Sequence, residues 1–478
     1  MSKMALNEEY IREIVTKTIE QIGLAEEPSA YPGAQDRPQA SGWLFDDVND
    51  AVAAAKDAQR ILVGMTLEKR GELIEAMRKA AMQNLEYLAR LAHDETGYGK
   101  VAHKIEKNKV AAQKTPGVED MGTVACTGDL GLTLVERAPF GVIGSITPST
   151  NPTSTVINNS ISMISAGNAV VFNPHPAAKN ASQETMRILN EAIVAAGGPS
   201  GLITTVKEPT IETGEKIMHH DDIPLLSVTG GEAVVSVAMK TEKRVIAAGP
   251  GNPPVIVDDT ADILKAAKDI VDGASLDNNV LCVAEKEVFA LDTIFDDLMR
   301  AMSDEGAFKI EKYDIAKIVN TVFEKRDGNY IVNRRFIGRD ATYILEKSGV
   351  GYTGSPRLVI AEVDKNHPFV RMEMLMPVLG MVRVNSFDEA LDEAFAAEQG
   401  NKHSAMIHST NIHHMSRAAT KMNTSIFVKN APSYTGLGYN GQGFTSFTIA
   451  TPTGEGLTSA ITFTRIRRCY LSGDFRIV

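Results

Sequence analysis

Cysteine is scarce in this sequence: Cys126, Cys282 and Cys469 are the only three among 478 residues. Three scattered thiols are too few for a disulfide framework or a cysteine-rich zinc site, so we expect a reducing compartment and no metal site. Positive charge is also in deficit, since 49 Lys and Arg stand against 60 Asp and Glu, for a net charge of −11. This balance argues against a surface that binds nucleic acid or an anionic membrane.

Long apolar runs are lacking as well. No segment approaches the ~20 apolar residues that a membrane span needs, and the N-terminus does not have the basic, apolar and small-residue order of a signal peptide. Apolar residues make up 43% of the chain and charged residues 23%, which is ordinary for globular proteins. At roughly 150 residues per domain, we expect a cytoplasmic protein of enzyme size with about three domains.

Residues 1–24 predict an amphipathic helix that stands apart from the rest. One face carries an apolar stripe at helical spacing, formed by Ile11, Ile14, Val15, Thr18, Ile19 and Ile22. Residues 25–41 are rich in Pro, Ala, Gly and charge without an apolar period, which is typical of a flexible linker. The linker favours a detachable docking peptide. The alternative is an ordinary N-terminal helix that packs on the body.

From Trp43 onward, helical stretches, expected over 46–59, 66–93 and 100–112, alternate with short β-branched runs. Apolar runs separated by helix-length segments are typical of parallel sheets with crossover helices. The runs form two series: 140–146, 168–172, 201–206, 225–228 and 244–248, then 254–257, 286–290, 358–361, 378–384, 404–407 and 425–428. The sequence therefore predicts two α/β domains in tandem.

Two further stretches, 131–137 and 462–471, alternate in the manner of antiparallel strands. Exposed strand edges are usually covered by a partner. We therefore expect a homo-oligomer, and both a dimer and a tetramer fit the sequence.

Among the three thiols, Cys282 is the candidate nucleophile. Cys126 and Cys469 fall in strand-like segments, where a small buried thiol is the default interpretation. Cys282 follows a polar loop with the turn-forming residues Asp277, Asn278 and Asn279, at a junction that could offer backbone N–H groups to a developing oxyanion. A catalytic thiolate at this place should be the first cysteine to react with iodoacetamide.

Several motifs occur together along the chain. They are residues 139–152 (PFGVIGSITPSTNP), 168–176 (NAVVFNPHP), 228–231 (VTGG), 275–282 (SLDNNVLC), 373–378 (EMLMPV) and 462–469 (TFTRIRRC). With these motifs the chain resembles the aldehyde dehydrogenase superfamily from about residue 42 onward. More narrowly, it resembles the CoA-acylating branch, the propionaldehyde and acetaldehyde dehydrogenases of bacterial microcompartments.

The resemblance implies an α/β fold with three parts. A Rossmann-type cofactor-binding domain would span residues 42–123 and 142–248, and an α/β catalytic domain residues 249–444. Antiparallel oligomerisation strands would come from residues 124–141 and 445–478.

The same resemblance implies that Cys282 is the nucleophile, whose thiolate attacks the aldehyde to give a thiohemiacetal oxyanion. In relatives the loop at 147–152 carries an Asn that stabilises this oxyanion. In the hydrolytic branch that Asn is third in a Pro-to-Pro stretch, whereas here Thr150 is third and Asn151 fourth. We assign the donor to Asn151, with Thr150 as the alternative.

An NAD site is also implied. Its residues would be Thr147, Pro148, Asn173, Pro174, His175, Thr229, Gly230, Gly231, Ala247 and Glu373. The Thr-Gly-Gly turn resembles the one whose following helix faces the pyrophosphate, and Glu373 matches the acid that holds the nicotinamide ribose. Hydrolytic relatives have a Lys and a Glu where this chain has Asn173 and Pro176, so the choice between NAD and NADP stays open.

One absent residue points to the acyl acceptor. Hydrolytic relatives carry a Glu that deprotonates the water that cleaves the thioacyl-enzyme, and an alignment on Pro253 puts Ala247 at that place. A CoA thiol ionises far more readily than water and attacks a thioester well. The missing carboxylate therefore favours transfer to CoA.

These residues and the resemblance imply an NAD-dependent, CoA-acylating dehydrogenase of acetaldehyde or propanal. It would work inside a bacterial microcompartment, with the N-terminal helix docked on shell proteins. One alternative is a hydrolytic or phosphate-dependent semialdehyde dehydrogenase, which Ala247 disfavours. The other is an inactive compartment scaffold, which the presence of Cys282 and Glu373 disfavours.

Overall fold

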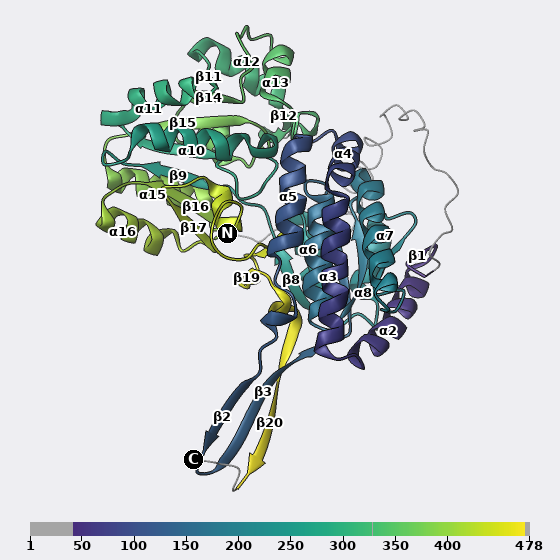
Figure 1. Cartoon of the computed structure of the whole chain (residues 1–478). Helices are drawn as coiled ribbons and strands as arrows, with labels where there is room; N and C mark the ends of the chain where they lie inside the picture. The colour runs from purple at the N-terminus through teal and green to yellow at the C-terminus, as the bar shows by residue number, and fades with distance from the viewer. Residues whose placement is uncertain (1–41, 327, 474–478) are drawn as a thin grey trace. The chain divides into compact units, whose positions relative to one another are not determined.

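The computed structural model describes residues 42–326 and 328–473. The expected docking helix (1–24) and linker (25–41) lie outside the described residues. In the described part, the expected α/β fold with two parallel sheets and a small antiparallel sheet is confirmed (Figure 1). No helix of this part is long and apolar enough to cross a membrane.

The first sheet has the strand order β1-β6-β5-β4-β7-β8, and every neighbouring pair is parallel. Its strands are β1 (Leu44–Phe45), β4 (Val142–Thr147), β5 (Ala169–Pro174), β6 (Ile203–Val206), β7 (Leu225–Thr229) and β8 (Arg244–Ala248). The helices of this half are α2 (Val48–Val63), α3 (Leu67–Gln83), α4 (Leu85–Thr96), α5 (Val101–Lys114), α6 (Pro152–Ser165), α7 (Lys179–Ala195), α8 (Ile211–His219) and α9 (Glu232–Ala238). Strands β4, β5 and β6 are buried throughout, which explains their continuous apolar runs.

The order in which the strands are added to the sheet reverses at β4. Strands β5 and β6 follow on one side of β4, whereas β7 and β8 lie on the other. In open parallel sheets, ligands bind outside the carboxyl ends of the strands at such a reversal of strand order. The fold therefore places a candidate cofactor crevice beyond the ends of β4 and β7.

The second sheet has the order β11-β14-β15-β10-β9-β16-β17 and is parallel throughout. Its strands are β9 (Pro254–Val257), β10 (Glu287–Leu291), β11 (Ala307–Lys309), β14 (Leu358–Glu362), β15 (Val378–Val384), β16 (Ser404–His408) and β17 (Ile426–Lys429). The helices of this half are α10 (Ile263–Ser275), α11 (Asp292–Asp304), α12 (Lys312–Val322), α13 (Ala341–Lys347), α14 (Pro368–Arg371), α15 (Phe387–Glu398) and α16 (Ile412–Met422).

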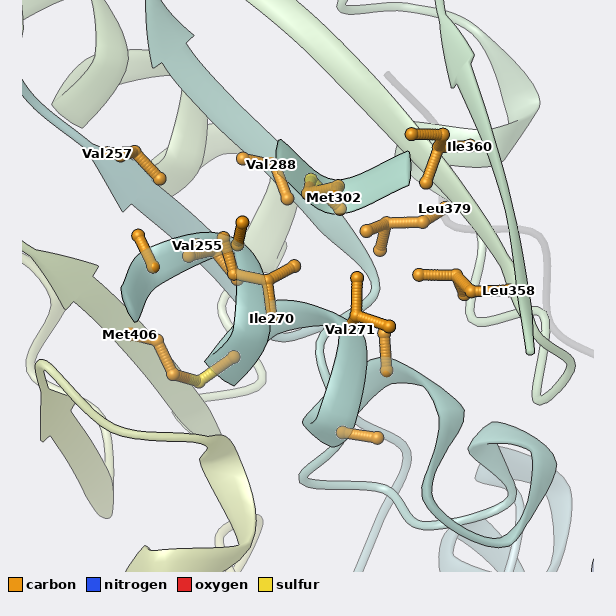
Figure 2. Close-up of a cluster of buried hydrophobic side chains, with 14 of the residues drawn as sticks. Val255, Val257, Ile270, Val271, Val288, Met302, Leu358, Ile360, Leu379 and Met406 are labelled. Atoms are coloured by element: carbon orange, nitrogen blue, oxygen red, sulfur yellow. The ribbon is translucent and has the colours of Figure 1, made fainter. Parts of the chain in front are cut away.

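Helices cover both faces of this second sheet. Val255 and Val257 of β9 pack with apolar side chains of α10 and α11, and Figure 2 shows Ile270, Val271 and neighbouring strand residues in this cluster. Ile256, between the two valines, packs instead with side chains of α15 and α16. This alternation follows from the pleat of a strand, which points successive side chains to opposite faces. The two cores hold the ends of the strands in fixed positions.

A separate antiparallel sheet has the order β2-β3-β20. Its strands are β2 (Val124–Gly128), β3 (Gly131–Pro139) and β20 (Thr464–Ser472). Residues of β2 and β20 are almost all exposed. Cys126 and Cys469 lie on these strands as expected, but both are exposed, so the expectation that they are buried is wrong.

All strands expected from the sequence are present, and the structure adds others. Helix 66–93 is interrupted at Asn84, whose Nδ2 donates to the Ala80 carbonyl and ends α3. The hairpin of β12 (Phe323–Arg326) and β13 (Asn329–Val332) was not expected. Strand β12 is charged and largely exposed, so it carries no apolar alternation that would reveal it.

Candidate active site

The candidate cofactor residues meet at the carboxyl ends of the first sheet. Thr147, the last residue of β4, pairs with Pro174 of β5, and Ile146 beside it pairs with Val228 of β7. The loop 148–151 and the turn 229–231 therefore leave the sheet next to each other. This is the crevice that the reversal of strand order predicts.

Asn151, a candidate catalytic residue, lies in the loop after β4 of the first sheet. The other candidate catalytic residue, Cys282, and the candidate cofactor residue Glu373 lie at the amino ends of strands in the second sheet, together with His403. Cys282 precedes β10, Glu373 precedes β15, and His403 directly precedes β16. Strands β15, β10, β9 and β16 are neighbours, so their amino ends bring these residues together. Gly251, just before β9, donates its N–H to Glu373 over 3.4 Å.

Gly251 is a close-approach position. A Cβ at this residue would lie 2.8 Å from Cγ of His403 and 2.9 Å from the Cys282 carbonyl oxygen. Contacts of this length are essentially forbidden, and the second one involves backbone that cannot move away. Only glycine allows the β8–β9 connection to lie this close to residues 276–282, the loop that ends at Cys282 and that we call the nucleophile loop.

The nucleophile loop has an unusual backbone. Asp277, Asn278 and Asn279 all have left-handed φ values of 49°, 53° and 65°. Asp and Asn tolerate this region better than other residues with side chains, which confirms the turn that the sequence predicts here. The loop is anchored by Asn278 Nδ2, which donates to the Gly338 carbonyl at 2.9 Å and to Asp340 at 2.8 Å.

A buried lysine supports the same loop from inside. Lys286 is 4% exposed, and its Nζ donates to the carbonyls of Asn279 at 3.0 Å and Leu281 at 3.1 Å. Burial lowers the pKa of Lys286, and the charges of Glu373 and Cys282 oppose this change. Lys286 therefore lies close enough to Glu373 and Cys282 for its charge to interact with theirs.

The thiol of Cys282 is protonated in the resting protein. Burial and the nearby charge of Glu373 raise its pKa to about 12, although Lys286 and the backbone N–H groups of Cys282 and Val283 act in the opposite direction. With this raised pKa we expect Cys282 of the resting protein to react more slowly with iodoacetamide than an unperturbed thiol does. Cys126 and Cys469 are the exposed thiols.

Asn151 is held by a lysine that sequence reasoning did not find. Lys107 Nζ on α5 donates to Asn151 Oδ1 at 2.6 Å and also to the carboxylate of Asp277. Thr150, the alternative donor, instead accepts a bond of 3.3 Å from Asn151 Nδ2. The structure thus connects Asn151 to the nucleophile loop through Lys107.

The candidate cofactor residues differ in whether their polar groups already have hydrogen-bond partners within the protein. Thr147 Oγ1 is buried and has no hydrogen-bond partner among the described residues, and side chains leave open space beside Gly231. Asn173, in contrast, donates to the Thr210 carbonyl at 3.1 Å and accepts from Thr213 at 2.7 Å. Its side chain is therefore engaged in holding α8 against β5. His175 beyond it is exposed.

Ala247 is fully buried on β8, and its N–H donates to Thr453 Oγ1 at 3.0 Å. No carboxylate can therefore come from this position. Among the described residues, no group of three or more His, Cys, Asp or Glu side chains is placed to hold a metal ion.

Sequence reasoning also missed His403. Burial, together with the charge of Lys286, lowers the pKa of His403 to about 4, so the ring is neutral near pH 7. Its Nδ1 lies 2.9 Å from Ser404 Oγ, and its Nε2 has no partner among the described residues. The only signal in the sequence was a histidine placed directly before a buried strand.

A small cavity lies between α5 and the nucleophile loop. Its volume is about 20 Å³, and its lining includes Val110, Leu281, Leu437 and Phe447. Lys107 also lines it. The cavity therefore adjoins both the nucleophile loop and the lysine that holds Asn151.

The fold and this arrangement define a two-sheet α/β enzyme in which Cys282, the candidate nucleophile, precedes β10 of the second sheet. A family model described as the aldehyde dehydrogenase family matches residues 44–445. The chain belongs to this family.

Three relatives illustrate how close the similarity is. An acetaldehyde dehydrogenase (acetylating) from Bilophila wadsworthia is 46% identical over 489 residues, covering 99% of this chain and 100% of the relative. A solved propionaldehyde dehydrogenase from the Clostridium phytofermentans fucose utilisation bacterial microcompartment has a TM-score of 0.89 and 48% identity, covering 91% of this chain and 99% of that one. A Rhodopseudomonas palustris propionaldehyde dehydrogenase, solved with bound CoA and an acylated cysteine, has a TM-score of 0.89 and 43% identity, covering 92% of this chain and 100% of that one.

Proposed function

We propose that this chain oxidises a short-chain aldehyde with NAD and CoA to an acyl-CoA and NADH, through a thioacyl-enzyme on Cys282. The observation that carries the proposal is the fully buried alanine at position 247, where no carboxylate can activate water against an acyl group on Cys282. The relative from Rhodopseudomonas palustris, which holds CoA and an acylated cysteine, supports the same route.

The first half of the reaction is an attack of Cys282 Sγ on the aldehyde carbon, after the thiol has lost its proton to solvent water. A carbon–sulfur bond forms, and the electrons of the carbonyl double bond move to oxygen. The N–H groups of Cys282 and Val283, which act on the sulfur in the resting protein, and Nδ2 of Asn151 are the donors for this oxyanion. Fixed donors in a water-poor site are worth far more than the same groups in water.

The second half transfers the acyl group. A CoA thiolate attacks the thioester carbon, the same donors stabilise a second oxyanion, and its collapse expels the Cys282 thiolate. The CoA thiol must lose its proton, and neutral His403 with its unpartnered Nε2 is a base of suitable protonation state close to the nucleophile loop. The expelled Cys282 thiolate then takes up the proton that His403 accepted from CoA, which restores the protonated resting form.

The described residues fit a dinucleotide. Thr147 offers an unsatisfied buried hydroxyl, and Gly231 leaves the start of α9 open. Thr147, Pro148 and residues 229–231 would hold the dinucleotide, and Glu373 its nicotinamide ribose. When bound, the nicotinamide accepts a hydride from the thiohemiacetal carbon. We assign NAD as the nucleotide.

The size of the cavity favours the shortest aldehydes. Its volume of about 20 Å³ is little more than one water-sized probe occupies. Its apolar lining residues, Val110, Leu281, Leu437 and Phe447, suit a methyl or ethyl group, although polar residues such as His103, Glu106 and Tyr434 also line it. Each further methylene would have to displace a side chain. We therefore propose acetaldehyde or propanal as the substrate.

We also propose a homo-oligomer built on the β2-β3-β20 sheet. Large apolar side chains are exposed on it, at Val124, Leu130, Ile466, Tyr470 and Leu471. Isolated edges with exposed apolar residues are aggregation-prone unless a partner covers them. A second copy of the chain is the proposed partner, in a dimer or a tetramer.

The N-terminal 24 residues are proposed to dock on microcompartment shell proteins. Deletion of this segment should leave turnover nearly unchanged and abolish co-purification with shells, because a helix on a tether stabilises little of the body. The double variant Ile14→Glu with Ile19→Glu should behave like the deletion. Loss of folding or of oligomeric state on deletion would instead show an integral structural helix.

The test of the proposed function is product analysis over a series of aldehydes. With NAD, CoA and acetaldehyde or propanal, we expect NADH and an equal amount of acyl-CoA. Free acid in the absence of CoA would support the hydrolytic alternative, and acyl phosphate formed with inorganic phosphate would support the phosphate-dependent one. A protein without any NADH formation would fit the inactive scaffold.

A further inference from the structure

Lys107 occupies a place where a positive charge is costly. It is 7% exposed, on the face of α5 that packs toward the nucleophile loop, and burial lowers its pKa to about 8 against the opposing charge of Asp277. Removing an ammonium group from water costs several kcal/mol unless it is paired and hydrogen-bonded. A residue that only filled this space would be apolar.

Asp277 holds the ammonium group in position. Lys104 and Lys107 lie three residues apart on α5, so both reach the same carboxylate. Burial alone would raise the pKa of Asp277, but the charges of Lys107 and Lys104 outweigh this and lower it to about 2. Asp277 is therefore ionised at all working pH values. The backbone N–H of Lys100 also donates to its Oδ1 at 2.8 Å.

The bond from Lys107 decides how the Asn151 side chain is oriented. An ammonium group has donors and no acceptor, so at 2.6 Å only the amide oxygen of Asn151 can face it. The NH₂ group must then point away from Lys107. One of its bonds goes to Thr150 Oγ1 at 3.3 Å, which leaves its other N–H for a ligand.

Lys107 also acts on the reacting sulfur. Its charge and that of the Cys282 thiolate attract each other. A positive charge beside the amide oxygen polarises the amide and strengthens the N–H bonds that it can donate. The same charge stabilises negative charge that develops at Cys282.

We propose that Lys107 is a positioning residue of the reaction: held by Asp277, it fixes the amide of Asn151 with its N–H side toward the thiohemiacetal oxyanion. The inference rests on the proposed function, in which Asn151 is the oxyanion donor. It links α5, the loop after β4 and the nucleophile loop through three side chains. None of the three is near another in the sequence.

Lys104 provides a matched control. Lys104 is 2% exposed and pairs with the same Asp277 at 3.1 Å, but it makes no bond to Asn151. The variants Lys107→Met and Lys104→Met each remove one buried charge from the same carboxylate and leave it the other lysine. Differences between them therefore report on what Lys107 alone does, which is its bond to Asn151 and its charge near Cys282; the double-mutant cycle with Asn151→Ala separates these two effects.

The experiment is stopped-flow measurement of the NADH burst with saturating NAD and aldehyde and without CoA. We expect Lys107→Met to slow the burst roughly 10- to 100-fold, below the ~10²–10³-fold cost of losing an oxyanion donor outright, with little change in KM for the aldehyde. Lys104→Met should stay within about threefold of wild type, and Lys107→Arg, which keeps the charge and donors, should recover part of the rate. Thermal unfolding of each variant verifies that it is folded.

A double-mutant cycle gives the decisive comparison. If Lys107 acts through Asn151, then Lys107→Met should slow the burst by less than about threefold once Asn151→Ala is already present. Equal losses in Lys107→Met and Lys104→Met, or fully additive losses with Asn151→Ala, would overturn the inference. If Lys107→Met does not fold, Lys107→Ala is measured in its place, and an unchanged burst rate in the folded Lys107→Ala variant would overturn the inference as well.

The outcomes separate this inference from the function on which it rests. An active wild type whose Lys107→Met variant keeps the full burst rate refutes the positioning role alone. A wild type without aldehyde-dependent NADH formation refutes the proposed function and this inference with it.

Discussion

In the resting protein, we expect the thiol of Cys282 to be alkylated slowly, and the rate of alkylation can be measured. Its pKa is raised from the ordinary value of 9.0 to about 12, and this difference of 3 units means about a thousandfold less thiolate at any pH below 9. The more basic thiolate is also intrinsically more nucleophilic. At a Brønsted slope of ~0.4–0.5, its rate constant for alkylation is roughly 15- to 30-fold higher. We therefore expect alkylation of Cys282 to be roughly 30- to 60-fold slower than that of an unperturbed thiol.

The assay follows iodoacetamide labelling from pH 7 to 11 without NAD or aldehyde. A Cys126→Ser, Cys469→Ser background removes the two exposed thiols. The rate should rise about tenfold per pH unit, without a plateau below pH 11. Glu373→Gln removes a charge that raises the pKa, so it should speed labelling at a given pH. A plateau near pH 8 in the parent protein would refute the argument from burial.

Three substitutions give further tests. Cys282→Ala should abolish NADH formation while the double variant of the other two cysteines keeps it, as measured by absorbance. Gly251→Ala should lower Tm and reduce activity at least tenfold, because its Cβ would lie 2.8 Å from the His403 ring, and overpacking of this kind typically costs about 1–3 kcal/mol. Phe447→Ala should enlarge the cavity beside the nucleophile loop and raise kcat/KM for butanal relative to acetaldehyde by about tenfold or more. Unchanged NADH formation in Cys282→Ala would contradict the assignment of Cys282 as nucleophile. Unchanged Tm and activity in Gly251→Ala would contradict the close approach of Gly251 to His403. An unchanged ratio of kcat/KM values in Phe447→Ala would contradict the assignment of the cavity to the substrate.

The strands could be predicted from the sequence because buried parallel strands are continuous apolar runs. Strands such as β4 and β5 are buried along their whole length, so composition and spacing reveal them. The exposed hairpin strand β12 carries Glu, Lys and Arg, and its pairing depends on β13 rather than on burial. Local sequence therefore holds no comparable signal for it.

The turn before Cys282 could also be predicted, since Asp277, Asn278 and Asn279 tolerate left-handed φ values. Its surroundings could not. Lys107 and His403 reach the site from α5 and from the start of β16, so only the fold brings them near Cys282. The protonation of the thiol likewise depends on burial, which no local pattern reveals.

Placing a water-activating carboxylate at position 247 should lower the stability of the fold. Ala247 is fully buried on β8, so Ala247→Glu would place a carboxylate in a packed interior. We expect reduced thermal stability and only a small gain in CoA-independent acid formation, at or below the low end of the ~10²–10⁴-fold worth of a general base.

The central claim is that the acyl group waits on Cys282 for CoA because position 247 carries no carboxylate to activate water. Rapid mixing of the wild type with NAD and acetaldehyde, without CoA, tests it most directly. We predict a burst of about one NADH per competent site followed by near silence, and renewed turnover as soon as CoA is added. Rapid multiple turnover to free carboxylate without CoA would contradict this account, because some other group would then have to activate water.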